Sequence, residues 1–362
     1  MKITALEIHP VSLRLKEPFK IALESVATAE NVYVKVLTDE GIAGWGEAAP
    51  FKMVTGETQE SIVTALRHLE EAVRGLDPLR PGLVCERMDQ KLVNNHGAKA
   101  AVVNAVYDII SQAFGAPLYR MLGGYRDEVR TDITCSIKNA PEMAEDARRA
   151  VKAGFTVLKI KVGLGLEEDV QRVAKIREAV GPGVKLRLDA NQGWTAREAV
   201  RALRALEGFE VEFVEQPVPA GDLDGLAEVR RSVSIPVMAD ESVFSPADAL
   251  RVIKRGAVDF INIKLMKSGG IYRALQINAL AEAAGIECML GQMVESRLGT
   301  TTAAHLAAAC RNITRVDLDM PLFLAEDPTS GGVSYHGERM ALPSAPGLGA
   351  VPDLARSPAL AG

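Results

Sequence analysis

The chain has 362 residues, of which 48% are hydrophobic and 25% are charged. This composition is typical of a globular protein with a large core, and the length predicts two domains or one large barrel with additions. Because 42 lysines and arginines stand against 47 acidic residues, for a net charge of −5, the sequence offers no basic face for nucleic acid or an anionic membrane.

Signals for export, membrane insertion and histidine-based metal binding are missing from the sequence. The first residues lack the apolar run and cleavage site of a signal peptide, and no apolar stretch approaches the ~18 residues of a membrane-spanning helix. The four cysteines are scattered without metal-binding spacing, which predicts reduced thiols and a cytoplasmic protein. The five histidines form no HxxxH or HxH pair, so we expect them at the surface or in packing.

The first ~120 residues are expected to form a mixed α+β unit. Apolar and polar residues alternate with the period of a strand in segments 3–15, 31–38 and 42–47. Helical periodicity follows in segments 59–74, 83–93 and 98–114. Segment 17–30 lies between the first two strands and is predicted to be a loop, and a long loop in a compact domain is often a lid over a site.

From about residue 129, short apolar runs alternate with amphipathic helical stretches. Eight strands are predicted, at 129–137, 156–162, 184–190, 211–215, 236–240, 260–265, 287–290 and 313–318. The intervening helices have recognisable starts, such as the cap Ser245 followed by Pro246. This pattern favours a (β/α)8-type barrel over an open doubly wound sheet, whose glycine fingerprint is incomplete at Gly163-Leu164-Gly165.

Ionisable residues recur at the carboxyl ends of these strands. A single charge there is usually a loop residue or half of a salt bridge, but six of the eight predicted strands place one at the same end and in the same parity. These residues are Lys159 and Lys161, Asp189, Glu215, Asp240, Lys264, and Asp317 with Asp319. Because carboxyl ends of barrel strands line the mouth where active sites lie, we expect these side chains to meet there.

Three carboxylates, from Asp189, Glu215 and Asp240, come from consecutive strands and would repel one another in one pocket. A hard divalent cation removes this repulsion, and an all-oxygen set favours Mg²⁺, or Mn²⁺, over zinc. The neighbouring acids Glu212 and Glu241 have the opposite parity and are not expected to point into the mouth.

Lys161 and Lys264 lie on strands two and six, which are diametrically opposed in a ring of eight. A planar intermediate held between them would meet one lysine on each face, so that one side removes a proton and the other returns it. Lysine titrates near ~10.4 and must be lowered to act as a base, which the like charges of Lys159 and the metal would do. The metal would stabilise the enediolate formed when an α-proton leaves a carboxylate.

These residues resemble a known family. The motifs are Lys159-Ile160-Lys161, Asp189-Ala190-Asn191-Gln192, Glu215-Gln216-Pro217, Ala239-Asp240-Glu241-Ser242 and Asn262-Ile263-Lys264, with Gly44-Trp45-Gly46-Glu47 and a Pro-Gly-Leu-Gly tail. As a set they are similar to the muconate-lactonizing branch of the enolase superfamily. The resemblance implies an α/β fold in which residues 121–325 form a modified TIM barrel, (β/α)7β. An N-terminal α+β capping domain, residues 1–120 with a lid at about 17–30, would be completed by residues 326–362.

Within the branch the chain looks most like the dipeptide epimerases, typified by the L-Ala-D/L-Glu epimerases. In that group the pair matching Asp317 and Asp319 binds the α-ammonium of the substrate, and two carboxylates far from the metal do need a cation. The resemblance further implies that Lys161 and Lys264 are the acid/base catalysts and that Lys159 assists them. Substrate contacts are implied for Thr134, Lys159, Gln292, Met293 and Val294, and a supporting role for Asn191.

One position departs from the family pattern. The lid residue that is an arginine in the Ala-Glu epimerases, where it pairs with the glutamyl side chain, is Glu24 here. As a substrate contact, Glu24 would suit a neutral or cationic side chain, unless Lys20 or Lys52 supplies a positive charge. The Ala-Glu specificity is therefore an open question.

The leading hypothesis is a Mg²⁺-dependent dipeptide epimerase that inverts the α-carbon of the C-terminal residue by a two-base 1,1-proton transfer. The alternatives are an N-acylamino-acid racemase, an o-succinylbenzoate synthase or another cycloisomerase of the superfamily, whose substrates carry no ammonium. The third hypothesis, from a different class, is a non-catalytic barrel that serves as a binding protein. The expected partner is a small dipeptide, and homo-oligomers are common in the branch.

Overall fold

The computed structural model describes residues 1–356 of the protein. Its N-terminal part is a three-stranded antiparallel sheet covered by helices. The strands are β1 (Ile3–Lys20), β2 (Ser25–Thr38) and β3 (Ala43–Ala48), in the order β1-β2-β3. The helices are α1 (Gln59–Val73), α2 (Pro81–Lys91), α3 (His96–Ala113) and the short α4 (Leu118–Met121). The predicted strands and helices of this part are confirmed, with ends shifted by a few residues, except between β1 and β2.

The predicted loop at 17–30 was wrong, because most of this segment is strand. β1 and β2 form a hairpin that pairs as far as Lys20 with Ser25, and the turn is closed by a 2.9 Å bond from Ile21 N to Glu24 O. The register shifts between Arg14 and Phe19, and beyond this bulge Phe19 and Ile21 are buried again. The apolar side chains therefore prolong the strands to a tip that reaches the barrel.

Two glycines explain the Gly44-Trp45-Gly46-Glu47 motif. A Cβ at Gly44 or Gly46 would collide with the carbonyl oxygens of Ala105 and Ala101 on α3. The helix therefore lies directly on β3 only because these positions have no side chain.

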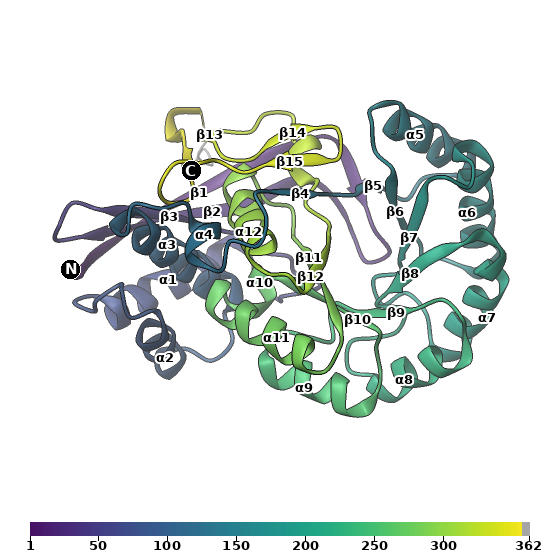
Figure 1. Ribbon diagram of the computed structural model, residues 1–362, viewed down its shortest axis with the longest axis horizontal. Helices are drawn as coiled ribbons and strands as arrows, with labels where there is room; N and C mark the ends of the chain where they lie inside the picture. The colour runs from purple at the N-terminus through teal and green to yellow at the C-terminus, as the bar shows by residue number, and fades with distance from the viewer. Residues whose placement is uncertain (357–362) are drawn as a thin grey trace.

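Residues 133–316 form the predicted barrel. Its strands are β5 (Ile133–Cys135), β6 (Val157–Lys161), β7 (Lys185–Asp189), β8 (Val211–Glu215), β9 (Val237–Ala239), β10 (Phe260–Lys264), β11 (Glu287–Gly291) and β12 (Ile313–Val316), all parallel and in sequential order. The covering helices are α5 (Ala140–Lys152), α6 (Leu166–Val180), α7 (Ala196–Leu206), α8 (Leu223–Ser232), α9 (Pro246–Arg255), α11 (Ile271–Ala283) and α12 (Arg297–Ala309). Figure 1 shows α5 to α9 on the outer side of the strands, as the (β/α)7β architecture requires. A short α10 (Leu265–Ser268) follows β10.

Local signals in the sequence set the ends of the barrel helices. α9 starts at Pro246 after the cap Ser245, whose hydroxyl accepts from Asp248 N, as predicted. α7 has a capping box between Thr195 and Glu198 and buries one stripe of residues against the barrel. These helices place the strand ends, and hence the charged residues, at one mouth.

The first barrel strand is shorter than predicted. The run 129–137 divides into β4 (Glu128–Arg130) and β5, and β4 instead joins a small sheet with β14 (Ser334–His336) and β15 (Arg339–Ala341). At the seam between β5 and β12, Asp132 N donates to Val316 O at 3.3 Å, and Leu318 N donates to Thr131 Oγ1 at 2.8 Å. These bonds link the segments next to β5 and β12, the two ends of the eight-stranded sheet.

The tail contacts both parts of the molecule. β13 (Thr329–Gly331) pairs with β16 (Ala350–Pro352), while Leu348 N donates to Asp108 on α3 at 2.8 Å. Residues 357–362 of the predicted tail lie outside the described residues. Division of the chain at residues 120 and 326 stays a prediction, since the tail binds to α3 of the cap as well as to β4 beside the barrel.

Candidate active site

A cavity lies at the mouth of the barrel, under the tip of the β1–β2 hairpin. Its polar lining consists of Thr134, Lys159, Lys161, Asn191, Lys264, Gln292, Asp317 and Asp319. All are positions singled out from the sequence. Lys161 ends β6 and Lys264 ends β10, four strands apart in the ring of eight, so the two lysines approach the cavity from opposite walls.

Asp189, Glu215 and Asp240 lie buried at one side of this cavity. Asp189 and Glu215 are paired in register on β7 and β8, and Asp240 follows β9 two residues after Met238, the register partner of Glu215. Asn262 Nδ2 donates to Glu215 Oε1 at 2.6 Å. Consecutive parallel strands therefore bring the three carboxylates together, as the spacing predicted.

Lysine ammoniums occupy the space among these carboxylates. Lys159 Nζ lies 3.0 Å from Asp189 and 2.8 Å from Glu215, and Lys161 Nζ lies 2.6 Å from Asp189. Lys264 Nζ lies 2.7 Å from Asp240. Every one of these side chains is almost fully buried, so the ion pairs are poorly screened by solvent.

The pKa values follow from burial opposed by these pairs. Burial raises the pKa of Asp189, but Lys159, Lys161 and Lys264 outweigh it and lower that pKa to about 2. Burial and repulsion from Asp189 raise the pKa of Glu215 to about 7. Burial lowers the pKa of Lys264, but attraction to Asp240 outweighs it, so the net pKa is raised. The predicted lowering of lysine pKa is thus not found for Lys264 while its carboxylate partner faces it.

The carboxylate trio fits a hard divalent cation. Glu215 Oε2 and both oxygens of Asp240 are buried and accept no hydrogen bond of good geometry, although lysines lie at ion-pair distance. All the donor atoms are oxygens, the set that Mg²⁺ prefers. These three oxygens attract positive charge, which the ammoniums of Lys159, Lys264 and Lys267 supply here and which a bound divalent cation would also supply.

A second acidic cluster lies across the mouth. Asp132, Asp317 and Asp319 are buried, with one oxygen of each within 4.8 Å of the others, closer than the trio around the lysines. Each already has a strong partner: Arg187 at 2.8 Å for Asp132, Lys159 at 2.6 Å for Asp317, and Thr134 N at 2.6 Å for Asp319. This cluster is a second candidate metal site, and its acids are held by partners at distances similar to those of the carboxylate trio.

Asp319 keeps one buried oxygen, Oδ1, without a partner. Burial and the neighbouring Asp317 raise the pKa of Asp319 to about 7. A cation that enters the cavity beside Asp319 would therefore be attracted strongly, and an ammonium can donate to the free oxygen.

Two buried charges of the site escaped the sequence reasoning. Lys267 Nζ lies 2.6 Å from Asp240 Oδ1 and also donates to the carbonyl oxygens of Asp240, Val243 (3.0 Å) and Asn262 (3.1 Å). Glu241 was not expected to point into the mouth, and it does not line the cavity, but it is buried next to Asp240 and its Oε1 accepts from Asn191 Nδ2 at 3.2 Å. Parity does not apply to Glu241, because β9 ends at Ala239 and the chain turns.

Glu212 was not expected to point into the mouth, and it does not. It is bound by Arg187 at 2.8 Å and Arg315 at 3.2 Å, and it does not line the cavity.

The three charged lid residues considered from the sequence do not line the cavity. Glu24 and Lys52 line a neighbouring recess, and Lys20 lines another. The resemblance to the lid arginine of the Ala-Glu epimerases implied a substrate contact for Glu24, whereas here Glu24 sits in a tight hairpin turn outside the cavity.

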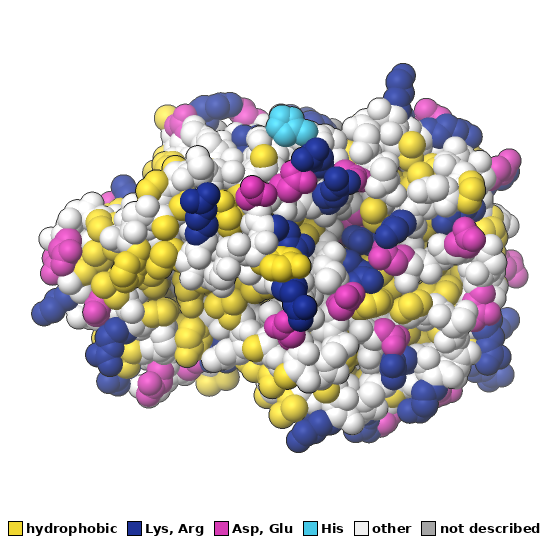
Figure 2. All heavy atoms as spheres, viewed as in Figure 1, with side chains coloured by type: hydrophobic (Ala, Val, Ile, Leu, Met, Phe, Trp, Pro, Cys, Tyr) yellow, Lys and Arg dark blue, Asp and Glu magenta, His cyan; other side chains and the backbone are white. Residues whose placement is uncertain are grey.

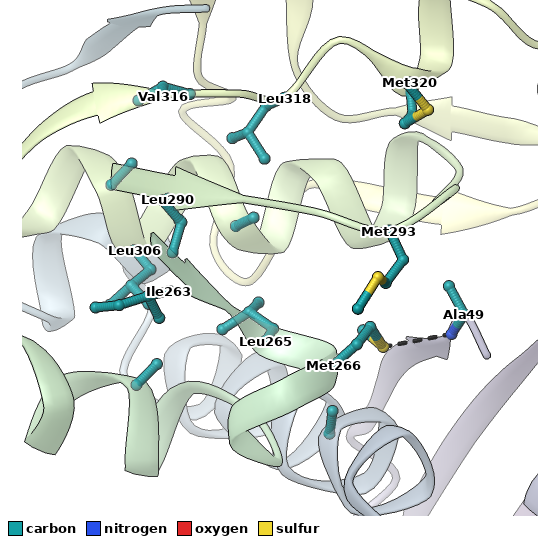
Figure 3. Packing of buried hydrophobic residues seen from close by; sticks show 14 of the residues in the cluster. Ala49, Ile263, Leu265, Met266, Leu290, Met293, Leu306, Val316, Leu318 and Met320 are labelled. Atoms are coloured by element: carbon teal, nitrogen blue, oxygen red, sulfur yellow. Dashed lines mark hydrogen bonds between the residues drawn. The ribbon is translucent and has the colours of Figure 1, made fainter. Parts of the chain in front are cut away.

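The cavity wall on the side of the capping sheet is apolar, and the sequence reasoning missed most of it. Besides Met293 and Val294, which were predicted, it consists of Phe19, Ile21, Phe51, Val54 and Met320. Figure 3 shows Met293 pointing toward Met266 of the barrel, whose sulfur accepts from Ala49 N of the cap at 3.3 Å. These residues come from four separate segments of the chain, so no local pattern links them in the sequence.

The sequence matches two known families of protein domains. Residues 3–123 match the N-terminal domain of the mandelate racemase / muconate lactonizing enzyme family, and residues 142–356 match the enolase C-terminal domain-like family. The chain belongs to the enolase superfamily.

Curated members of the superfamily are similar along their whole length. The chain is 48% identical over 355 residues to the L-Ala-D/L-Glu epimerase of Bacillus subtilis, with 97% of each protein covered. It is 47% identical to the hydrophobic dipeptide epimerase of Enterococcus faecalis, covering 96% of this chain and 99% of that one. The solved structure of the E. faecalis dipeptide epimerase with Mg and the dipeptide L-Leu-L-Tyr matches with a TM-score of 0.95, covering 97% of this chain and 99% of that chain.

Proposed function

We propose that the protein is a Mg²⁺-dependent dipeptide epimerase that inverts the α-carbon of the C-terminal residue. The observation that carries the proposal is the pairing of two opposed lysines, Lys161 and Lys264, with a carboxylate trio on one side and Asp319 on the other. The superfamily membership and the epimerase names of the similar proteins agree with it.

Asp189, Glu215 and Asp240 would hold the Mg²⁺. When bound, the ion supplies Lewis-acid stabilisation of the negative charge that a carboxylate gains as its α-proton leaves. Carboxylates engaged by a divalent cation attract the lysines less, which lowers the lysine pKa toward the range that a base requires.

The lysines carry the proton transfer. One lysine, as the neutral amine, removes the α-proton on its face, and the other, as the ammonium, delivers a proton to the opposite face of the planar enediolate. Lys159 lies between Asp189, Glu215 and Asp317 and adds a fixed positive charge beside the substrate carboxylate. Reversing the roles returns the original configuration, so the enzyme would interconvert the two epimers.

Asp317 and Asp319 would bind the α-ammonium of the dipeptide. This feature favours a dipeptide over the substrates of N-acylamino-acid racemases and o-succinylbenzoate synthases, which have no ammonium for Asp319 Oδ1. Thr134 N holds the other oxygen of Asp319 in place at 2.6 Å.

The surroundings agree with a small-molecule enzyme. Figure 2 shows acidic and basic side chains interspersed on the visible face, without a gathering of one sign. Among residues 1–356, no helix has the length and apolar character needed to cross a membrane. The four cysteines are free and buried, which supports a place in the cytoplasm. The formation of a homo-oligomer stays a prediction.

The test is deuterium uptake from heavy water. Protein, Mg²⁺ and a library of dipeptides are incubated, and the mass of each dipeptide is followed by mass spectrometry. We expect one deuterium at the α-carbon of the C-terminal residue, together with formation of the epimer. A library in which no dipeptide gains mass would contradict the proposal.

A further inference from the structure

The apolar wall of the cavity bears on which dipeptide the enzyme turns over. Its members Phe19 and Ile21 belong to the hairpin tip, Phe51 and Val54 to the loop after β3, and Met293 and Val294 to the loop after β11. Phe19 is fixed by an edge-on contact with Phe323, with ring centroids 5.6 Å apart. We refer to these six side chains as the cap wall.

The four substituents of the α-carbon have defined destinations in this cavity. In the proposed reaction the α-proton points along the line between Lys161 and Lys264, the carboxylate toward Lys159 and the cation that the carboxylate trio would hold, and the amide toward Asp317 and Asp319. The barrel floor thus accounts for three substituents, and the side chain is left to point away from the floor, toward the cap wall.

The cap wall offers no charge to a charged side chain. The cationic groups that line the cavity are Lys159, Lys161 and Lys264, and each is already paired with a carboxylate at the floor. The carboxylates that line it are Asp317 and Asp319, which the substrate ammonium would occupy. A glutamyl or lysyl side chain would be buried against apolar atoms without a partner, which is strongly unfavourable.

Epimerisation adds a second argument. The wall must hold the side chain before and after inversion, when its direction from the α-carbon has changed. Apolar contacts are non-directional and tolerate this change.

We propose that the cap wall selects dipeptides whose C-terminal residue has an apolar side chain, such as leucine, methionine or phenylalanine. This inference rests on the proposed epimerase function and narrows its substrate class. Phe19, Ile21, Phe51, Val54, Met293 and Val294 are the specificity-determining residues.

The nearest alternative is a cationic side chain that passes beyond the wall. The recess behind Phe51 and Val294 is lined by Glu24, Glu30, Glu57 and Glu60 together with Lys52. Two of these acids are already engaged: Glu57 accepts from Gly97 N at 3.0 Å, and Glu30 accepts from Ser12 Oγ at 2.5 Å. Phe51 and Val294 also stand between the recess and the cavity, since they line both.

The experiment compares L-Ala-L-Leu, L-Ala-L-Glu and L-Ala-L-Lys in heavy water with Mg²⁺, measured as kcat/KM for deuterium uptake. We expect the leucine dipeptide to exceed the other two by about 100-fold or more, because each charged side chain loses its hydration without a partner. Equal or higher kcat/KM for glutamate or lysine would overturn the selection of apolar residues. If none of the three dipeptides, and no other in the library, exchanges, the failure is that of the epimerase function itself.

A charge placed in the wall gives the second arm. Val54 is half-buried on a loop, so Val54→Arg is expected to fold, and Ile21→Arg offers a second position. Either change should raise the glutamate-to-leucine ratio of kcat/KM by about 10-fold or more, since one unpaired carboxylate gains a charged hydrogen bond. The matched control Glu24→Gln, outside the cavity, should leave the ratio within about 2-fold. A ratio unchanged in both arginine variants, or shifted equally by Glu24→Gln, would contradict the assignment of the wall.

Discussion

Lys267 lies in a cage of oxygen atoms directly beneath the active site. Its ammonium group contacts one carboxylate oxygen of Asp240 and three backbone carbonyls, and the side chain is fully buried. Burial lowers the pKa of Lys267 despite the attraction of Asp240. The ammonium therefore joins the end of β9 to the end of β10 and holds Asp240 in position.

Lys267→Met should destabilise the protein by about 3–5 kcal/mol, because it leaves the carboxylate and carbonyls without their donor. Chemical denaturation of the apoprotein measures this loss. The matched control Lys175→Met breaks an exposed pair with Glu178 of similar length, 2.7 Å, and should change stability by less than about 1 kcal/mol. Equal losses of stability in the two variants would show that the cage contributes no more than an exposed ion pair.

Asp319 supplies the residue-scale test of substrate choice. In the wild type, kcat/KM for a free dipeptide should exceed that for its N-acetylated form, which has no ammonium. Asp319→Asn should reduce kcat/KM for the free dipeptide by about 10–100-fold, the value of a hydrogen bond to a charged group. The N-acetylated form should be affected much less. Equal losses for both substrates would remove Asp319 from ammonium binding.

At the scale of elements, a buried polar bridge joins the capping sheet to the loop that carries Met293 and Val294. Glu47 on β3 accepts from Ser296 N and Gly299 N, each at 2.9 Å, and Asn31 on β2 donates to Glu47 and to Val294 O. Glu295 lies beside it: a Cβ at Gly299 would collide with Glu295 Oε2 and lie 2.9 Å from Glu47 Oε2. Glu295 Oε1 accepts from Met293 N at 2.9 Å, whereas Glu295 Oε2 has no partner.

This bridge predicts a pH-dependent stability. Burial and repulsion from Glu47 raise the pKa of Glu295 to about 8, well above its unfolded value of ~4.3. Between these values the folded protein binds the extra proton, so the contribution of Glu295 to stability is full below ~4.3 and is lost as pH rises through about 8.

Glu295→Gln cannot ionise and should therefore lose less stability on raising the pH. From pH 5 to pH 8 the free energy of unfolding of Glu295→Gln, relative to that of the wild type, should rise by up to about 1.4 kcal/mol per pH unit, the value for one proton. Denaturant unfolding across this range measures the difference. Parallel pH profiles for the two proteins would contradict the raised pKa.

Elements were predictable where one face of a regular period is buried. The strands from β6 to β12 and their charged ends followed from alternation, because Leu158 and Ile160 pack outward while Lys159 and Lys161 point inward. The hairpin tip could not be predicted, because the bulge between Arg14 and Phe19 breaks the alternation that identifies a strand. Glu241 and Lys267 escaped for a similar reason: both lie just past a strand end, where parity says nothing about direction.

At the scale of the whole molecule, the site exists only between the two parts. The barrel supplies the lysines and carboxylates, and the cap supplies Phe19, Ile21, Phe51 and Val54. Such contacts join residues more than a hundred positions apart, and no period in the sequence encodes them. The lysines and carboxylates could therefore be predicted from the strand ends, whereas the residues that face the substrate side chain could be found only in the structure.

Metal binding should be visible without any reaction. Mg²⁺ at 100 times its Kd should stabilise the folded protein by about 2.7 kcal/mol, provided that it does not bind the unfolded chain. Thermal unfolding with and without chelator measures this effect. Glu215→Gln removes one proposed ligand while keeping its shape, and it should largely abolish the increase in Tm. A wild-type Tm that is the same with and without Mg²⁺ would contradict the assignment of the carboxylate trio.

The two-lysine account is tested most directly by stereospecific exchange. Lys161→Ala and Lys264→Ala are each incubated with Mg²⁺ and the separate epimers of a dipeptide substrate in heavy water. We predict that neither variant epimerises, and that the base left in each exchanges the α-proton of one epimer only, with opposite choices in the two variants. Normal epimerisation by either variant, or exchange of the same epimer by both, would contradict the placement of the lysines on opposite faces of the substrate.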